Sequence, residues 1–117
     1  NRTVDKAKKL IEFFPETTLI EWGTKIEVDM IINATSVGLK ENDNLNIDIN
    51  GFEGNKFFYD VIYNPKETKF LKDAKSQGNI TENGKMMFIY QAHQAFSVWH
   101  KILPKIDSEL IKLIEND

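Results

Sequence analysis

The stretch VDMIINATSVGL, residues 28–39, decides the fold. Its apolar part, Met30 to Ile32, has no polar alternation, which is typical of a parallel strand that helices cover on both faces. The residues that follow, Asn33 to Gly38, are mostly small or hydrogen bonding, and such residues let a ligand approach the backbone closely. Open α/β sheets bind their ligands at the carboxyl ends of strands of this kind. We therefore expect a buried parallel strand that ends in a binding loop.

The same design returns in FFYDVIYNP, residues 57–65. Residues 57–63 predict a second buried strand, which the Asn64-Pro65 pair ends because proline has no N–H group to donate to a neighbouring strand. Asp60 lies inside this apolar run, where an unpaired carboxylate would be costly to bury. We expect Asp60 to be hydrogen bonded and structural.

Length and composition favour one soluble domain without a metal site. The chain has 117 residues, and its 15 Lys and Arg against 18 Asp and Glu give a net charge of −3, which argues against general binding to nucleic acids or anionic membranes. It has no cysteine, and its two histidines do not form a zinc-binding pattern. Neither a signal peptide nor a run long enough to span a bilayer is recognised, so we expect a cytoplasmic protein.

The first quarter of the chain predicts a helix and a short strand. Thr3 is suited to be the N-cap of a helix that ends before Pro15. Thr17 to Trp22 is rich in β-branched and aromatic residues, which is typical of a strand. We expect that strand to lie apart from the later ones.

Three more helices are predicted in the second half of the chain. The first follows Thr68 and ends at Gly78, with a short extended segment after it. The second, between Gly84 and Leu103, carries a wide apolar stripe, so we expect it to be buried on more than half of its circumference. The third follows Asp107 or Ser108. The side chains expected to point inward from the first and the third are Phe70, Leu71, Ala74, Leu110, Ile111, Leu113 and Ile114.

Four motifs occur in a recognisable order. They are NRT at residues 1–3, before a helix; NATSVGL at residues 33–39; YDVIYNP at residues 59–65; and GKMMFIYQAHQAFSVW at residues 84–99. Together they resemble the C-terminal, cofactor-binding portion of shikimate dehydrogenase, an NADP-dependent oxidoreductase of aromatic amino-acid biosynthesis, the chorismate pathway. The resemblance implies an α/β fold in which residues 1–83 form an incomplete, three-layer, Rossmann-like domain with a mostly parallel sheet. Residues 84–117 would be C-terminal helices that bridge to a substrate domain.

The resemblance implies a site for the 2′-phosphate of NADP. In dinucleotide-binding folds an acidic residue after the second strand binds the ribose, and an arginine there accommodates a 2′-phosphate instead. The residues that match this site are Asn1, Arg2, Thr3 and Lys6. The simpler alternative is that Arg2 is a surface residue and Thr3 only caps a helix.

The strand ends and the long helix carry the remaining implied roles. The resemblance assigns cofactor binding to Asn33, Ala34, Thr35, Ser36, Val61 and Gly84, and substrate binding to Tyr63 and Gln91. Simpler alternatives exist for three of these places. Residues 33–38 would be an ordinary polar turn, Tyr63 a core tyrosine with a hydrated hydroxyl, and Gln91 a core amide with its hydrogen bonds satisfied.

Two features of the family have no counterpart in the sequence. No glycine-rich GxGxxG turn precedes residues 1–3, and the family's catalytic lysine and aspartate belong to the preceding substrate domain. Lys66 and Asp60 do not take those roles, so no catalytic residue is predicted in this chain. We expect an N-terminally truncated portion that is inactive alone, whereas its parent would reduce 3-dehydroshikimate to shikimate.

Several alternatives remain open. A quinate-using relative cannot be separated from a shikimate-using one, a nucleotide-fold methyltransferase would explain the YNP at residues 63–65, and a non-catalytic α/β interaction domain would explain the core alone. Loss of the first strands would expose sheet edges, and exposed edges favour pairing between copies. We therefore expect a homodimer or an altered position of the first strand.

Overall fold

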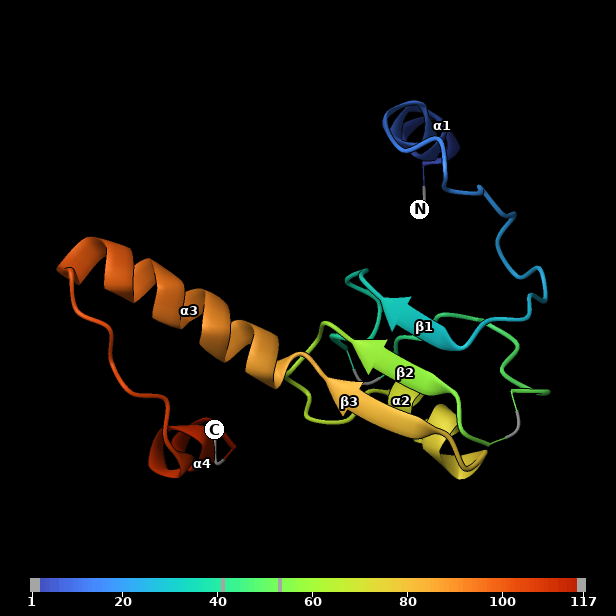
Figure 1. The fold of residues 1–117 in the computed structure, drawn as a ribbon. Helices are drawn as coiled ribbons and strands as arrows, with labels where there is room; N and C mark the ends of the chain where they lie inside the picture. Colours follow the sequence, from blue (N-terminus) through green and yellow to red (C-terminus); the bar gives the residue numbers. More distant parts are fainter. Residues whose placement is uncertain (1–2, 41, 53, 116–117) are drawn as a thin grey trace.

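The computed structural model of the chain describes residues 3–40, 42–52 and 54–115. These residues contain four helices and three strands (Figure 1). In chain order they are α1 (Val4–Phe13), β1 (Met30–Asn33), β2 (Phe57–Asp60), α2 (Lys69–Ser76), β3 (Ile80–Asn83), α3 (Lys85–His100) and α4 (Ser108–Glu115).

The three strands form a parallel sheet in the order β1-β2-β3. Asn33 pairs with Asp60, and Asp60 pairs with Asn83, so a polar residue ends each strand at the same edge of the sheet. This arrangement confirms the predicted parallel strands. It also brings together the polar strand ends on which the sequence argument depended.

The core lies on one face of the sheet, around Phe58, which is fully buried. The Phe58 ring contacts Phe52 edge-on at a centroid distance of 6.0 Å and Phe70 at 5.4 Å. Phe52 comes from the irregular segment between β1 and β2, and Phe70 comes from α2. Helix α2 packs on β2 and β3 with Phe70, Leu71 and Ala74 buried, as predicted.

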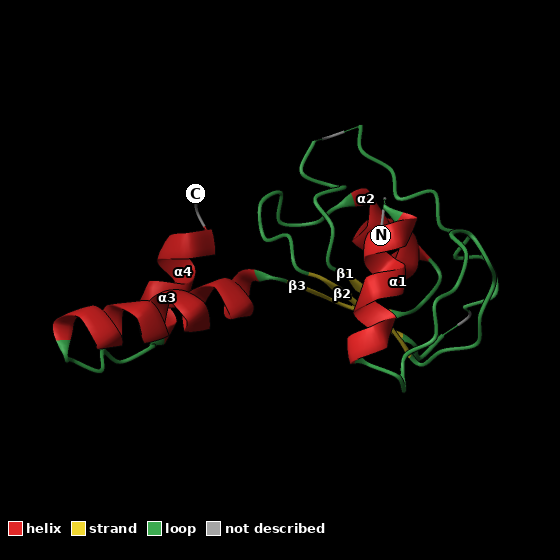
Figure 2. Ribbon diagram, turned by 90° about the horizontal axis from the view of Figure 1, so that it is seen from above, coloured by secondary structure: helices red, strands yellow, loops and turns green. Residues whose placement is uncertain are grey.

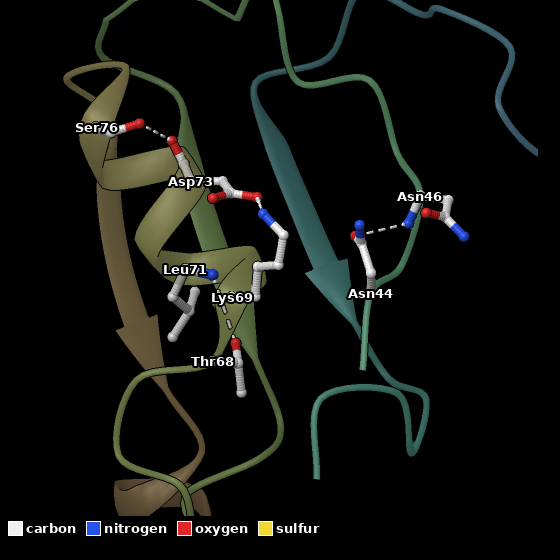
Figure 3. Close-up of polar contacts among 7 residues, drawn as sticks. All are labelled: Asn44, Asn46, Thr68, Lys69, Leu71, Asp73 and Ser76. Atoms are coloured by element: carbon white, nitrogen blue, oxygen red, sulfur yellow. Dashed lines mark hydrogen bonds and ion pairs between the residues drawn. The ribbon is translucent and has the colours of Figure 1, made fainter. Parts of the chain in front are cut away.

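The start and the end of α2 follow the predicted capping pattern. The Leu71 N–H donates to the Thr68 hydroxyl, 3.4 Å away, and Lys69 forms an ion pair with Asp73 on the outer surface (Figure 3). Gly78 adopts a positive φ of 79° just after the helix, which glycine does at little cost.

The opposite face of the sheet is open in the part of the chain that the structure describes. Met30 and Ile32 of β1 and Ile80 of β3 are 53%, 55% and 57% exposed there. The prediction that β1 is buried on both faces is therefore wrong for this chain. Figure 1 gives the reason: α1 lies beyond the outer edge of β1 rather than over either face.

The strand predicted at Thr17 to Trp22 is not formed. These residues run from α1 to β1 as an irregular, exposed segment. A strand needs a neighbour that satisfies its backbone N–H and C=O groups, and among the described residues none lies beside this segment. Its β propensity alone is insufficient.

The C-terminal helices are much more exposed than expected. In α3 only Ile89 is buried, and Trp99 is 77% exposed, so the prediction of a helix buried on more than half of its circumference is wrong. Figures 1 and 2 show the cause, because α3 leaves the sheet and projects away from it. In α4, Leu110 and Leu113 are exposed rather than inward, although Asp107 accepts from the Leu110 N–H at 3.0 Å, as predicted for its cap. Within the described ranges, no helix has the length and apolar character needed to cross a bilayer.

Candidate functional site

A buried carboxylate lies at the centre of the strand ends. The Asp60 side chain is fully buried, and one of its oxygens, Oδ1, accepts from Asn33 Nδ2 at 3.1 Å and from the Ile62 N–H at 3.0 Å. The other oxygen, Oδ2, accepts from the Thr68 hydroxyl at 2.6 Å. These bonds confirm that Asp60 is hydrogen bonded, as a buried carboxylate must be. The sequence suggested Thr68 only as a helix cap and missed this second role.

The loop after β1 is built around the side chain of Asn33. Its Oδ1 accepts from the N–H of Thr35 at 3.0 Å and from the Thr35 hydroxyl at 2.7 Å. Its Nδ2 also donates to the Val37 carbonyl at 3.0 Å, and the Val37 N–H donates to the Thr35 hydroxyl at 3.1 Å. Asn33 is thus directed into the protein, whereas Ala34, Thr35 and Ser36 are exposed. Of the four predicted cofactor residues at positions 33–36, three are therefore exposed, whereas Asn33 is buried and forms hydrogen bonds with the loop.

The far end of the same loop is also held in place. Asp43 Oδ2 accepts from the N–H groups of Gly38 and Lys40, both at 3.1 Å. The Gly38 bond, and then the Lys40 bond, keep the pKa of the Asp43 carboxyl below its usual range, because both favour the charged form. Gly38 is buried with φ of 119°, and a Cβ there would lie 3.1 Å from the Ile62 side chain. The protein's own hydrogen bonds and packing therefore support the conformation of this loop.

The start of α3 is in direct contact with the end of β2. The Gly84 N–H donates to the Ile62 carbonyl at 3.1 Å, and a Cβ on Gly84 would lie only 1.9 Å from the Val61 carbonyl oxygen. Glycine is thus required here by the protein's own backbone. The structure brings together Val61 and Gly84, two of the predicted cofactor residues.

Tyr63, one of the two predicted substrate residues, lies against α3, the helix that carries the other one, Gln91. The Tyr63 ring stacks on Phe88 of α3, with the ring centroids 4.4 Å apart and the planes 19° apart. Gln91 is exposed and lies three positions after Phe88, so both side chains are on neighbouring parts of one helix surface. The position of Phe88 three residues before Gln91 on the same helix is the sequence signal that could have identified it.

The predicted 2′-phosphate residues are described only in part. Asn1 and Arg2 lie outside the described residues. Thr3 is at the N-cap position of α1, where its carbonyl accepts from the Ala7 N–H at 3.3 Å, and Lys6 is exposed on the first turn. Because α1 lies beyond the edge of β1, these two residues are separate from the residues at the ends of the three strands (Figure 1).

Two other features of the structure are not part of the predicted site. His93 is half-buried, and its Nε2 lies 2.8 Å from the Pro104 carbonyl oxygen. An open cavity of about 420 Å³ lies between α2 and β3 and contains only one of the strand-end residues, Asn83. Its lining residues are Lys66, Glu67, Leu71, Lys75, Thr81, Glu82, Asn83 and Lys85. None of the predicted site residues lines it.

Comparison with known proteins gives one consistent result. No family model matches the chain. The chain is 61% identical over 115 residues to the shikimate dehydrogenase (NADP(+)) of Pelagibacter ubique, and this match covers 98% of the chain and 43% of that protein.

Solved structures agree. The shikimate dehydrogenase of Aquifex aeolicus matches 100% of the chain and 43% of its own length, with 32% identity and a TM-score of 0.79. The 5-ketofructose reductase of a Gluconobacter species matches 99% of the chain and 45% of its own length, with 28% identity and a TM-score of 0.81. The chain spans less than half the length of each of these relatives. The resemblance to shikimate dehydrogenase is confirmed, and the chain is a homologue of part of that enzyme over nearly all of its own residues.

Proposed function

We propose that this chain is the C-terminal, NADP-binding portion of a shikimate dehydrogenase. Residues 1–83 would belong to the cofactor domain, and residues 84–117 would connect it to the substrate domain. The observation that carries this proposal is the 61% identity to the Pelagibacter ubique enzyme over 98% of the chain. NADPH, when bound, would supply the hydride that reduces the ketone of 3-dehydroshikimate to the hydroxyl of shikimate.

The sheet is suited to be one half of a larger, three-layer domain. In doubly wound dinucleotide folds the strand order is 3-2-1-4-5-6, and β1-β2-β3 would correspond to the last three strands. Strands from the remainder of the parent would then extend the sheet at the outer edge of β1, between that edge and α1. Helices from the same part would cover Met30, Ile32 and Ile80 on the open face. The exposed apolar residues described above support this arrangement.

The residues of the chain fit NADP at two separate places. At the start of α1, backbone N–H groups without helical partners, Arg2 and Lys6 would bind the 2′-phosphate with Asn1 and Thr3. At the strand ends, Ala34, Thr35 and Ser36 offer an exposed, prearranged loop against which the nicotinamide riboside could lie.

Val61 and Gly84 would complete the nicotinamide end of the site through their backbones. Tyr63, held by its stack on Phe88, and Gln91 would hydrogen bond the hydroxyl or carboxylate groups of the substrate. Proton transfer would require groups from the substrate domain, where the resemblance places the family's catalytic lysine and aspartate. The chain alone is therefore expected to bind nucleotide without turnover.

A nucleotide comparison tests the proposal. We expect 2′-phospho-AMP to bind at least about tenfold more tightly than AMP, since a charge-assisted phosphate site contributes roughly 1.5 kcal/mol or more. The measurement is a heteronuclear NMR titration of the chain with each nucleotide. Lys6→Gln should reduce the preference, whereas Lys8→Gln, on another face of α1, should leave it unchanged.

The alternatives predict other outcomes. Equal affinity for the two nucleotides would contradict the NADP assignment, binding of S-adenosylmethionine would indicate a methyltransferase, and no nucleotide response would indicate an interaction domain. Oxidation of NADPH by the chain in the presence of 3-dehydroshikimate would contradict the absence of catalytic groups.

A related ketone reductase is the second candidate function. The similarity to 5-ketofructose reductase, with a TM-score of 0.81, supports the same portion serving a different ketone. The higher identity to the Pelagibacter ubique enzyme favours 3-dehydroshikimate. Quinate remains an alternative substrate, because the residues that distinguish the ring substituents would lie in the substrate domain.

We also propose that the isolated chain forms a homodimer through the outer edge of β1. This edge has no strand partner among the described residues, and Ile32 beside it is 55% exposed. Light scattering should give twice the chain mass of 13.6 kDa. Ile32→Lys should give a monomer, because a charged residue on an edge strand opposes pairing, whereas Asp48→Lys in an exposed loop should not. A monomeric wild-type chain at about 100 μM would refute the dimer.

A further inference from the structure

Asp60 is the most deeply buried charged group among the described residues, at 0% exposure. Burying a carboxylate is costly unless its oxygens are fully hydrogen bonded. The side chain of Asp60 accepts from Asn33, from the Ile62 N–H and from Thr68, which are all neutral donors. A carboxylate suits them because it only accepts hydrogen bonds and has room for about four, whereas an amide would turn an NH₂ group toward one of these donors.

The three donors come from three different segments. Asn33 ends β1, Ile62 follows β2, and Thr68 begins α2. One carboxylate therefore fixes the relative positions of two strand ends and a helix start. These segments are separated by 27 positions on one side and 8 on the other, so no local interaction could do the same.

The bond to Asn33 extends this control to the exposed loop. With its amide held by Asp60, Asn33 accepts from Thr35 and donates to Val37, which sets the backbone of residues 34–37. On the other side, the carbonyl of Ile62 accepts from the Gly84 N–H, which connects the same cluster to α3.

We infer that Asp60 is a positioning residue for the nicotinamide end of the site: it holds the 33–38 loop and the end of β2 in the geometry that receives the cofactor, without touching it. The inference rests on the proposed function above. It assigns the buried Asn33 to the same supporting role, one step nearer to the ligand. Lys6, the predicted 2′-phosphate residue on α1, is independent of it, because no residue of α1 takes part in these hydrogen bonds.

The test is Asp60→Asn, which keeps the size of the side chain and removes its charge. We expect the affinity for NADPH, measured by its fluorescence, to fall roughly tenfold toward that of 2′-phospho-AMP. The affinity for 2′-phospho-AMP itself should stay within about twofold. Asp73→Asn, on the outer surface of α2, is the matched control and should change neither affinity. Equal losses for both ligands would indicate general destabilisation and overturn the inference.

A second measurement does not depend on ligand. In Asp60→Asn the amide hydrogen exchange of Thr35, Val37 and Ile62 should accelerate together, by about tenfold or more, while that of Ala74 in α2 stays slow. Thr68→Val keeps the shape but removes the hydrogen bond to Asp60, together with the longer cap contact with the Leu71 N–H. It should give a smaller acceleration at Thr35 and Ile62, and it serves if the first variant does not fold. Acceleration at Ile62 alone, or at none of the three, would overturn the inference. If the wild type binds NADPH no better than 2′-phospho-AMP, the nicotinamide part of the proposed function fails, and the exchange rates still decide the role of Asp60.

Discussion

Replacing Gly84 with alanine is expected to lower the free energy of unfolding by about 3 kcal/mol or more. The backbone at Gly84, with φ of −75° and ψ of 4°, is accessible to alanine, so the cost is purely steric. The new Cβ would lie 1.9 Å from the Val61 carbonyl oxygen and 2.5 Å from its carbonyl carbon, both of them backbone atoms that no rotamer change can move. Urea unfolding followed by circular dichroism would measure the loss.

Gly78→Ala is the informative control for Gly84→Ala. A Cβ on Gly78 meets no atom within 4 Å, but its φ of 79° is strained for alanine, at a cost of about 1 kcal/mol. The two variants thus separate steric overlap from backbone strain. An equal or smaller loss of unfolding free energy for Gly84→Ala than for Gly78→Ala would contradict the close contact between Gly84 and the Val61 backbone.

Replacing Phe58 with alanine is expected to cost about 3–5 kcal/mol, because the side chain is fully buried between Phe52 and Phe70. A loss of this size is comparable with the total stability of many small domains. The midpoint of thermal unfolding should therefore fall by at least about 10 °C, or the cooperative transition should disappear. Differential scanning calorimetry would measure either result.

Phe13→Ala provides the matched comparison for Phe58→Ala. Phe13, at the end of α1, is 78% exposed, so its removal should change the unfolding free energy by no more than about 0.5 kcal/mol. Similar losses for the two variants would mean that α1 packs against the rest of the chain in solution.

Local signals predicted the parts of the fold that local physics controls. Thr68 and Gly78 define the ends of α2, and Phe70, Leu71 and Ala74 define its buried face, because capping and helical periodicity need no distant partner. The runs at residues 30–32 and 57–63 predicted two strands, which the structure places at Met30–Asn33 and Phe57–Asp60 and pairs with each other.

The failed predictions of a strand and of buried helix faces each required a distant partner. Trp99 and Leu110 form apolar helix faces that are exposed here, and Thr17 to Trp22 has strand propensity without a neighbouring strand. A hydrophobic pattern indicates that a surface is suited to burial, but it does not say which part of a protein covers it. The chain matches only 43% of its Pelagibacter ubique relative, so a covering element need not be within it.

The candidate site was predictable as a set of segments but not as a set of contacts. The motifs identified the loop at residues 33–38, Val61 and Gly84, which the structure places at the strand ends and the start of α3. They did not distinguish Asn33, whose side chain supports the loop from within, from the exposed Thr35 and Ser36. Whether a polar side chain points inward depends on the register between strands, which a single sequence does not specify.

The contact between Gly84 and the end of β2 also limits how α3 can move relative to the sheet. The first turn of α3 is joined to the sheet by the Gly84 hydrogen bond, by contact with the Val61 backbone and by the stack of Phe88 on Tyr63. The helix continues for 16 residues, about 24 Å. The helix is thus attached to the end of β2 at its first turn. A displacement of its far end, near Trp99, would either bend the helix beyond Phe88 or move the sheet together with it.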